Sequence, residues 1–165
     1  MHNFKESMSR ILNTVSVLAI PNEETLLGID AVTISSLVST SVQEGEEEIM
    51  FILKKNSYLT EKLKIGIQFS VNVLSDSQKN IAAFYGGGSP NLDEVGNSNI
   101  SSWEHFNAIP RLCDAHVNLM CLLEGLHKRR SSTLFFAKVT SHKFTEESHP
   151  LLHYQRDYYS IDGKL

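Results

Sequence analysis

Hydroxyl-bearing side chains are concentrated between residues 33 and 41, and two lysines follow farther along the chain. The first segment reads Thr33-Ile34-Ser35-Ser36-Leu37-Val38-Ser39-Thr40-Ser41, and the second reads Lys54-Lys55-Asn56-Ser57. Hydroxyl, amide and ammonium groups all donate hydrogen bonds, and those from a charged donor are the stronger ones. If the fold brings the two segments together, they could hold a small anion. The same residues would equally suit a polar edge strand with a hairpin, because Ser and Thr are common in strands and turns.

Other arrangements that could do chemistry are missing from the sequence. The histidines at 105, 116, 127, 142, 149 and 153 include no HExxH motif, so we predict no metal site. The phosphate-binding patterns GxGxxG and GxxxxGK[ST] do not occur, and no acid–base dyad stands out. We therefore predict no catalytic side chain.

The periodicity of apolar residues predicts the elements that hold these segments. Phe4, Met8, Ile11 and Leu12 share one face of a short N-terminal helix. Strands are predicted at 14–20, 33–41, 49–53, 69–73, 115–125 and 133–139, with a last extended segment at 151–159. Helical turns are predicted at 58–64 and after the capping box Ser75-Asp76-Ser77-Gln78.

Two further stretches carry expectations about burial. Ile49 to Leu53 is apolar on both faces, which predicts a central strand buried on both sides. Residues 89–108 are polar and predict a long loop, in which Trp103 is a packing anchor. The count is six or seven mostly antiparallel strands with two or three short helices, which suits a small closed or nearly closed β-barrel. A β-sandwich is the competing fold.

Composition limits the class of protein. The 165 residues suit a single domain spanning 1–165, and 41% hydrophobic with 21% charged residues is ordinary for a globular chain. A net charge of −4 provides no basic footprint for nucleic acid. No apolar run approaches the ~20 residues that span a bilayer. Cys113 and Cys121 form no CxxC pair and Met1–Glu6 lacks a secretory signal, so we expect a cytoplasmic protein with reduced thiols.

Several motifs, taken in order, resemble the flavin reductase-like family, which has the FMN-binding split-barrel fold. Thr33-x-Ser35-Ser36-x-x-Ser39-x-Ser41 is similar to its flavin-cradling T-x-S-S-x-x-S-x-S segment. Further matches are Phe4–Ser9 with Thr14–Val17, Lys55-Asn56-Ser57, Val71–Leu74 with Gln78 and Tyr85-Gly86-Gly87, Trp103 with Pro110-x-Leu112-x-x-Ala115, and Pro150–Tyr158. No single motif is specific, whereas their order and spacing together are.

The resemblance implies a mainly β fold, a six- to seven-stranded antiparallel split barrel, and a homodimer that binds FMN, or FAD, near the subunit interface. Family members pass a hydride from NADH or NADPH to the flavin, and a separate monooxygenase uses the reduced flavin. The chemistry belongs to the cofactor, so the protein needs mainly to position two rings.

The resemblance also assigns residues of this sequence to sites. The implied cofactor-binding residues are Thr33, Ser35, Ser36, Ser39, Lys55, Asn56, Ser57, Tyr85, Gly86 and Gly87. The implied nicotinamide-binding residues are Ser132, Arg156 and Tyr158.

Three departures from the family pattern affect the expected activity. Ser132 stands where the family has the His of G-D-H, which contacts the nicotinamide side. Glu44-Gly45 replaces a Pro-Pro pair, and His153 replaces the first Tyr of the closing segment. The first departure leaves open a flavin carrier or sensor without efficient NAD(P)H turnover. A split-barrel oxidase of the pyridoxamine-phosphate type is a third option, although its arginine-rich signatures are not visible.

The dimer prediction has a second basis in the C-terminal segment. We expect an isolated chain to expose apolar and aromatic side chains at Leu151, Leu152, Tyr154 and Tyr158. An apolar patch above a few hundred Å² is uncommon on a monomer. We therefore predict that a second copy covers this segment in a C2 homodimer.

Overall fold

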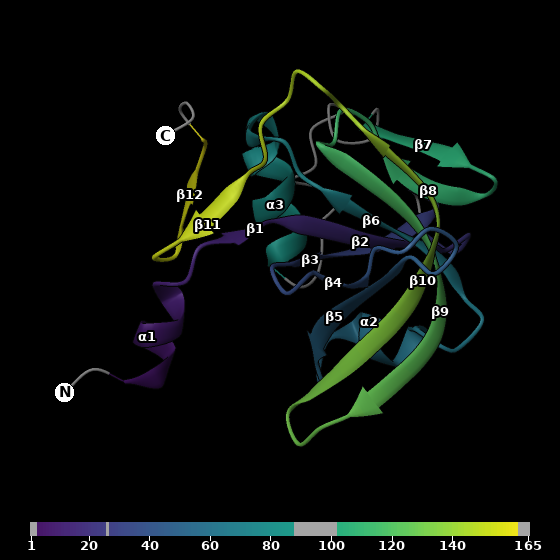
Figure 1. Ribbon diagram of the computed structural model, residues 1–165, viewed down its shortest axis with the longest axis horizontal. Helices are drawn as coiled ribbons and strands as arrows, with labels where there is room; N and C mark the ends of the chain where they lie inside the picture. Colours follow the sequence, from purple (N-terminus) through teal and green to yellow (C-terminus); the bar gives the residue numbers. More distant parts are fainter. Residues whose placement is uncertain (1–2, 26, 88–101, 162–165) are drawn as a thin grey trace.

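A computed structural model describes residues 3–25, 27–87 and 102–161 (Figure 1). In chain order its elements are α1 (Phe4–Ser9), β1 (Asn13–Thr14), β2 (Ser16–Pro21), β3 (Ile29–Ile34), β4 (Val38–Ser41), β5 (Glu48–Lys54), α2 (Tyr58–Lys62), β6 (Gln68–Val73), the 3-10 turn η1 (Asp76–Gln78), α3 (Lys79–Gly86), β7 (Trp103–Phe106), β8 (Ile109–Leu112), β9 (Val117–Lys128), β10 (Ser132–Phe144), β11 (Leu152–Tyr154) and β12 (Asp157–Tyr159).

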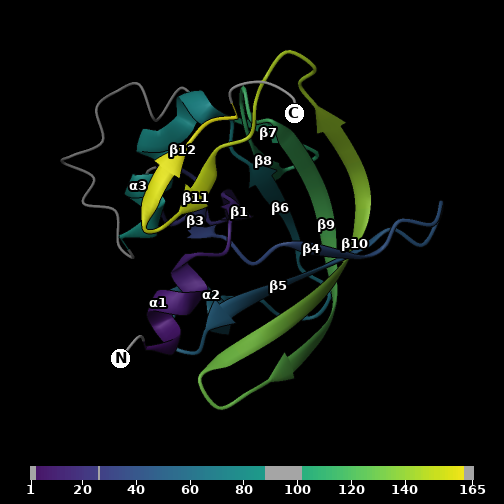
Figure 2. The same cartoon turned by 60° about the vertical axis from the view of Figure 1, so that its left-hand side comes forward.

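The main sheet has seven strands in the order β3-β2-β6-β9-β10-β5-β4, and every neighbouring pair is antiparallel. The sheet curls strongly, as Figure 2 shows from the side. Strands β3 and β4 follow one another in the chain but stand at opposite ends of the strand order. The predicted mainly β, six- to seven-stranded antiparallel split barrel with short helices is therefore confirmed.

Two apolar clusters hold the sheet together. Inside the barrel, Phe51 stacks on Phe135 with ring centroids 5.1 Å apart, and Phe69 meets Phe51 edge-on. Helix α2 closes this cluster by inserting Leu59, while Leu63 follows directly after the helix. The second cluster lies between β2, β3 and α3. Residues 16–20 of β2 are buried on both faces because one cluster covers each.

A buried amide on β6 joins four strands. Asn72 donates to the carbonyl of Val17 at 3.0 Å, and its own oxygen accepts the backbone N–H of Leu112 at 3.1 Å. Asn118 donates to the same oxygen at 2.8 Å. A buried amide is tolerated only when its donors and acceptors are paired, and at Asn72 they are.

Strand β5 differs from its expected burial. Ile49, Phe51 and Leu53 face the core, whereas Met50 and Ile52 lie on the outer face of the sheet, where Ile52 is 37% exposed. The prediction that both faces are buried was wrong. The reason is that β5 is next to the edge strand β4, and no described layer covers the outer face.

Part of the predicted loop at 89–108 is also ordered differently. Trp103–Phe106 forms β7, which pairs with β8 through a two-residue turn whose residues Asn107 and Ala108 have positive φ. Residues 88–101 lie outside the described part of the chain. Trp103 packs against the second cluster, as the anchor role predicted.

The two ends of the chain meet in a small sheet. Strand β1 pairs with β11, and β11 pairs with β12, so the predicted single extended segment at 151–159 is a hairpin. Its turn residues Gln155 and Arg156 both have positive φ, as two-residue hairpin turns require. Leu151 is 2% exposed and Leu152 is also buried within the single chain. The expectation that both leucines need a second copy to cover them was therefore wrong.

Helix α1 forms as predicted but ends at Ser9, short of Leu12. None of its residues is buried, and Phe4 is 80% exposed. Figure 1 shows the helix standing off the sheet. The apolar spacing thus predicted the helix correctly, yet its apolar face stays largely open to solvent.

Candidate functional site

The serine-rich segment lies at the open edge of the sheet. Ser36 accepts a hydrogen bond from the backbone N–H of Ile52 and donates one to its carbonyl, both at 3.0 Å. Its proton is thus already used, so Ser36 fixes the course of the segment and can only accept from a ligand. Among the described residues, the exposed hydroxyls of Ser35 and Ser39 have no hydrogen-bond partner. These two keep their donors available.

The corner after β5 lies beside the start of β10. Ser132 pairs with Lys54 in the strand register, and the backbone N–H of Lys55 donates to the carbonyl of Ser131 at 3.0 Å. Neither Lys54 nor Lys55 forms an ion pair within the described residues, and the side chain of Asn56 is exposed. Ser57 is the N-terminal cap residue of α2. The fold thus joins the predicted cofactor corner to the predicted nicotinamide residue Ser132.

The end of α3 lies against β3. The Thr33 hydroxyl donates to the carbonyl of Ala82 at 2.9 Å, and a Cβ at Gly86 would lie 3.9 Å from the Thr33 side chain. Gly86 and Gly87 are exposed, so their backbone is open to a ligand. Tyr85 is buried, and its hydroxyl accepts from Trp103 at 3.1 Å. Burial raises the pKa of Tyr85, whose ring packs in the second apolar cluster.

Arg156 and Tyr158 belong to a different neighbourhood. Both lie on the C-terminal hairpin, which is tied to α1 by a hydrogen bond from the Gln155 backbone to the Ser9 carbonyl. The Tyr158 ring packs against His153 and beneath the Lys79 amine, and burial raises the pKa of Tyr158. No strand pair or hydrogen bond joins these two residues to Ser132 within the described residues.

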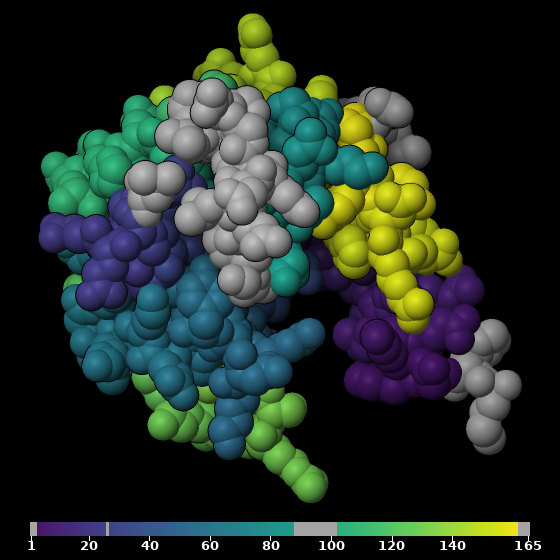
Figure 3. Space-filling view, turned by 180° about the vertical axis from the view of Figure 1, so that it is seen from behind, coloured from purple at the N-terminus to yellow at the C-terminus, as the bar shows by residue number. Residues whose placement is uncertain are grey.

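A hollow separates these two neighbourhoods on one face of the molecule (Figure 3). The purple N-terminal segment and the yellow C-terminal segment form one wall, and the blue-teal segment after β5 forms the other. The N-terminal wall includes α1, with its exposed apolar side chains. A ligand lying in the hollow could therefore meet both groups of predicted site residues.

The outer face of the sheet beside the corner is apolar. Val38, Met50 and Phe136 are aligned across β4, β5 and β10, and Ile52 is aligned with Leu134 in the next row. All five are partly or fully exposed. The row after Ile52 and Leu134 on this face contains Lys54 and Ser132, so the apolar face ends at the predicted site.

Sequence reasoning missed His127 as a member of this neighbourhood. His127 pairs with Leu134 across the β9–β10 hairpin, so it lies on the same outer face as Ser132. Side chains of paired residues share a face, and alternate residues of one strand do so as well. No sequence motif links His127 to Ser132, because the two are separated by the turn of the hairpin. Only the register of the hairpin shows that they share a face.

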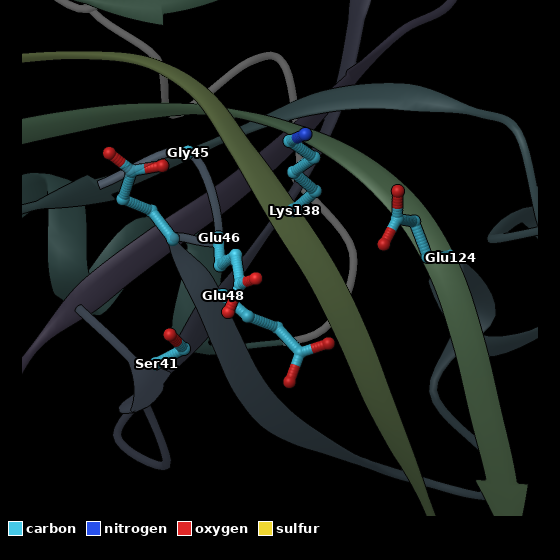
Figure 4. Close-up of a pocket in the computed structure, with 7 residues that line it drawn as sticks. Ser41, Gly45, Glu46, Glu48, Glu124 and Lys138 are labelled. Carbon is cyan, nitrogen blue, oxygen red and sulfur yellow. The ribbon is translucent and has the colours of Figure 1, made fainter. Parts of the chain in front are cut away.

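A second hollow of about 370 Å³ lies at the opposite end of β5 (Figure 4). Glu46, Glu48 and Glu124 approach it with Lys138, and no ion pair forms between them. Its turn includes Gly45 at φ 84°, a value that proline cannot adopt, which explains why a Pro-Pro pair would not fit here. Its negative charge makes this end unsuitable for a phosphate.

Neither a cluster of metal ligands nor a membrane-spanning helix is found among the described residues. No three His, Cys, Asp or Glu side chains are grouped closely enough to hold a metal ion there. Across residues 3–25, 27–87 and 102–161, no helix has the length and apolar character that crossing a bilayer requires.

Comparison with known proteins assigns the family. A family model described as "Flavin reductase like domain" matches residues 8–162. The chain belongs to the flavin reductase-like family. This confirms the family resemblance drawn from the motifs and makes the flavin reductase-like chain an oxidoreductase. No curated protein sequence matches it.

Solved structures share the fold of this flavin reductase-like protein. The styrene monooxygenase flavin reductase from Pseudomonas putida S12 is 24% identical, with 99% of this chain and 100% of that chain covered and a TM-score of 0.81. A flavin reductase domain protein from Arthrobacter sp. FB24 is 18% identical over 98% and 95% of the two chains, also at 0.81. An NADH:FAD oxidoreductase from Streptomyces globisporus C-1027, in complex with NAD and FAD fragments, is 16% identical over 96% and 90%, at 0.81.

The residues at the site fit a flavin nucleotide. Its phosphate requires donors and positive charge, which the Ser35 and Ser39 hydroxyls and the Lys54 and Lys55 amines supply, since none of them has a side-chain partner among the described residues. Its apolar ring system requires an apolar surface, which Ile52 and its neighbours present beside the same corner.

Proposed function

We propose that the protein is an NAD(P)H-dependent flavin reductase that uses FMN or FAD and spans the whole chain as one domain. The observation that carries the proposal is the pairing of Ser132 with Lys54, which sets the predicted nicotinamide residue beside the predicted flavin corner. Two substrates that exchange a hydride must be held in near contact, and adjacent sites meet that need.

The chain's own residues would bind the flavin and the nicotinamide nucleotide and orient them. Ser35 and Ser39 would donate hydrogen bonds to the flavin, while Lys55 would neutralise its phosphate and Asn56 and Ser57 would hold the corner. Gly86 and Gly87 would let the backbone approach closely. When bound, the flavin supplies the two-electron chemistry, since it accepts a hydride from a reduced nicotinamide. Arg156 and Tyr158 would receive the nicotinamide nucleotide from the far wall of the hollow.

Stopped-flow mixing of flavin-loaded protein with NADH, and separately with NADPH, tests the activity. We expect the visible flavin absorbance to bleach faster than that of free flavin under the same conditions. Equal rates with and without protein for both nucleotides would exclude the reductase function. The ratio of the two rates identifies the preferred donor.

The identity of the flavin can be read from the purified protein. A neighbour in fold is named an NADH:FAD oxidoreductase, and the family fold carries the name of FMN, so both cofactors are candidates. We expect a yellow preparation, or one that becomes yellow on titration with FMN. Chromatography of the flavin released on heating distinguishes FMN from FAD.

The reduced flavin would go to a separate enzyme. Neighbours in fold are named as the flavin reductase of a styrene monooxygenase and as the flavin reductase component of a two-component tryptophan halogenase. By analogy with these systems, we propose a partner monooxygenase. Oxygenated product should appear when this protein, NADH and flavin are added to a partner oxygenase, and should fail to appear without the protein.

The second candidate is a flavin carrier or sensor, which the absence of the usual histidine favours. Restoring it as Ser132→His should strongly raise NADH oxidation if Ser132 limits turnover. His127 lies on the same face and could serve instead, so His127→Ala separates the cases. Wild-type turnover already equal to that of Ser132→His would eliminate the carrier. A loss only in His127→Ala would show that His127 replaces the missing side chain.

We also propose a homodimer in which a second copy covers the outer apolar face. The proposal rests on two exposed apolar surfaces of one chain, the face around Ile52 and the helix α1 with Phe4 and Met8. In a two-fold dimer the same patch is used on both subunits, so apolar side chains of one copy would cover apolar side chains of the other. Because the flavin corner adjoins this face, the second copy would also complete the cofactor site.

A further inference from the structure

A cavity of about 590 Å³ lies between α2 and the β9–β10 hairpin. In Figures 1 and 2 this hairpin extends past α2, so that its inner face overhangs the helix end. Leu126 and Thr133 face the cavity from the hairpin, and they lie on the opposite face of the strands from His127 and Ser132. The cavity is therefore on the other side of the sheet from the proposed hydride-transfer site.

The deep part of the cavity is apolar with one available hydroxyl. Leu63 is 2% exposed and Leu126 is half-buried, while Ile65 extends this apolar wall toward solvent. Thr133 is only 4% exposed, yet its hydroxyl has no hydrogen-bond partner among the described residues. The Thr133 oxygen is not among the fully buried unpaired atoms of the described residues, so it opens onto the cavity and could donate to a ligand or a water there.

The rim of the cavity is positively charged. Lys64, Lys128 and Arg129 line it together with Lys55 of the proposed flavin corner, against the single carboxylate of Glu61. None of the four cations forms an ion pair within the part of the chain that the structure describes. Four like charges around one opening repel one another, and this concentration stands out in a chain of net charge −4.

We propose that this cavity binds an amphipathic organic anion. The apolar body of the ligand would lie on Leu63, Ile65 and Leu126, and an acceptor atom would take the free proton of Thr133. Its carboxylate, sulfonate or phosphate would lie at the rim beside Lys128 and Arg129, since charge-assisted hydrogen bonds favour an anion there. The volume is within the range of small-molecule sites, about 300–1,000 Å³. The proposal does not depend on flavin turnover.

Titration of the full chain with the fluorescent sulfonate 8-anilinonaphthalene-1-sulfonate tests this site. We expect saturable binding that weakens at high salt, because the rim attraction is screened. Saturating FMN should weaken probe binding only slightly, because Lys55 alone is shared with the proposed flavin corner, and the uncharged analogue N-phenyl-1-naphthylamine should bind at least tenfold more weakly. Displacement of the probe by FMN, or equal affinity of the neutral analogue, would overturn the proposal.

A pair of matched double variants tests the role of the rim. Lys128→Glu with Arg129→Glu should weaken probe binding at least tenfold. Arg130→Glu with Lys138→Glu makes the same change in net charge outside the cavity and should alter it less than twofold. Equal losses in both would mean a general charge effect and would refute the site.

The wild-type protein provides a test that needs no substitution. Amide chemical-shift changes on adding the sulfonate should concentrate at 60–66 and 126–133, which border the cavity. Changes confined to 33–39 and 85–87 would place the probe at the flavin site and contradict the inference.

Discussion

Tyr58 links helix α2 to strand β3 through its hydroxyl, which donates to the carbonyl of Ala31. Burial first, and the nearby Asp30 second, raise the pKa of Tyr58 to about 12. The neutral phenol is therefore the form that the folded state prefers. This makes one side chain responsible for part of the alkaline behaviour of the whole protein.

We expect Tyr58→Phe to lower the free energy of unfolding by about 1 kcal/mol below pH 10, since it removes one hydrogen bond. Between pH 10 and 12 the unfolded state loses the tyrosine proton first, so wild-type stability falls with rising pH. The phenylalanine variant lacks this contribution, and the gap between the two proteins should narrow.

Urea unfolding at pH values just below 10 and near 12 measures this difference. Tyr159→Phe, at an exposed position on β12, serves as the control. A gap for Tyr58→Phe that is constant across the range would contradict the assignment.

At the candidate site, the sequence indicated which side chains could donate hydrogen bonds, but not which of them are already paired or buried. The spacing of Ser35, Ser36 and Ser39 indicated a cluster of hydroxyl donors, but it did not reveal that Ser36 donates its proton to the carbonyl of Ile52. The family resemblance assigned Tyr85 to the cofactor site, and the structure adds that its ring is buried in the core. These outcomes depend on packing between distant strands, which spacing along one strand does not encode.

At the scale of elements, Asn72 is the polar residue on which the junction of β2, β6, β8 and β9 depends. It connects Val17, Leu112 and Asn118 in one buried network. Such a network is favourable only while each member stays paired, because an orphaned buried group is costly.

Asn72→Ala should lower the free energy of unfolding by about 3 kcal/mol, since it leaves several buried groups unpaired. Asn118→Ala should cost less, because Asn72 keeps its bonds to Val17 and Leu112. Thermal or urea unfolding of both variants measures the ranking. A loss below about 1 kcal/mol for Asn72→Ala would show that water replaces the amide.

Helices and strands were more predictable from the sequence than the layers that pack against them. Periodicity located α2, β6, the capping box and the long β9–β10 hairpin, because local pattern dictates local structure. It failed where the outcome depends on the neighbouring layer, as for the outer face of β5. It also failed at the β11–β12 turn, because Gln155 and Arg156 adopt positive φ without the usual Asn or Gly.

At the scale of the molecule, the outer apolar face decides the proposed assembly. Ile52→Asp would place a charge in the proposed interface, where desolvation costs several kcal/mol. We expect this variant to be monomeric and to bind FMN more weakly than wild type.

Phe144→Asp is the matched control, because Phe144 is exposed at the far end of β10 from Ser132. It should remain dimeric with unchanged FMN affinity. Light scattering and FMN titration measure both properties. An Ile52→Asp protein that stays dimeric, or that becomes monomeric with undiminished FMN affinity, would separate assembly from the cofactor site. Tyr154→Asp tests in the same way whether the C-terminal hairpin contributes.

The pairing of Thr14 with Leu152 affects the order in which the nascent chain can fold. On the ribosome, β1 has no partner until β11 is made, and at about 5–20 residues per second that wait is on the order of ten seconds. The seven-stranded sheet needs nothing beyond Phe144, so it can assemble first. The segment with Phe4 and Met8 is apolar and stays exposed before and after that pairing, so chaperones could recognise it. Strand β11 then anchors β1, and any cofactor that depends on Arg156 must be captured after that step.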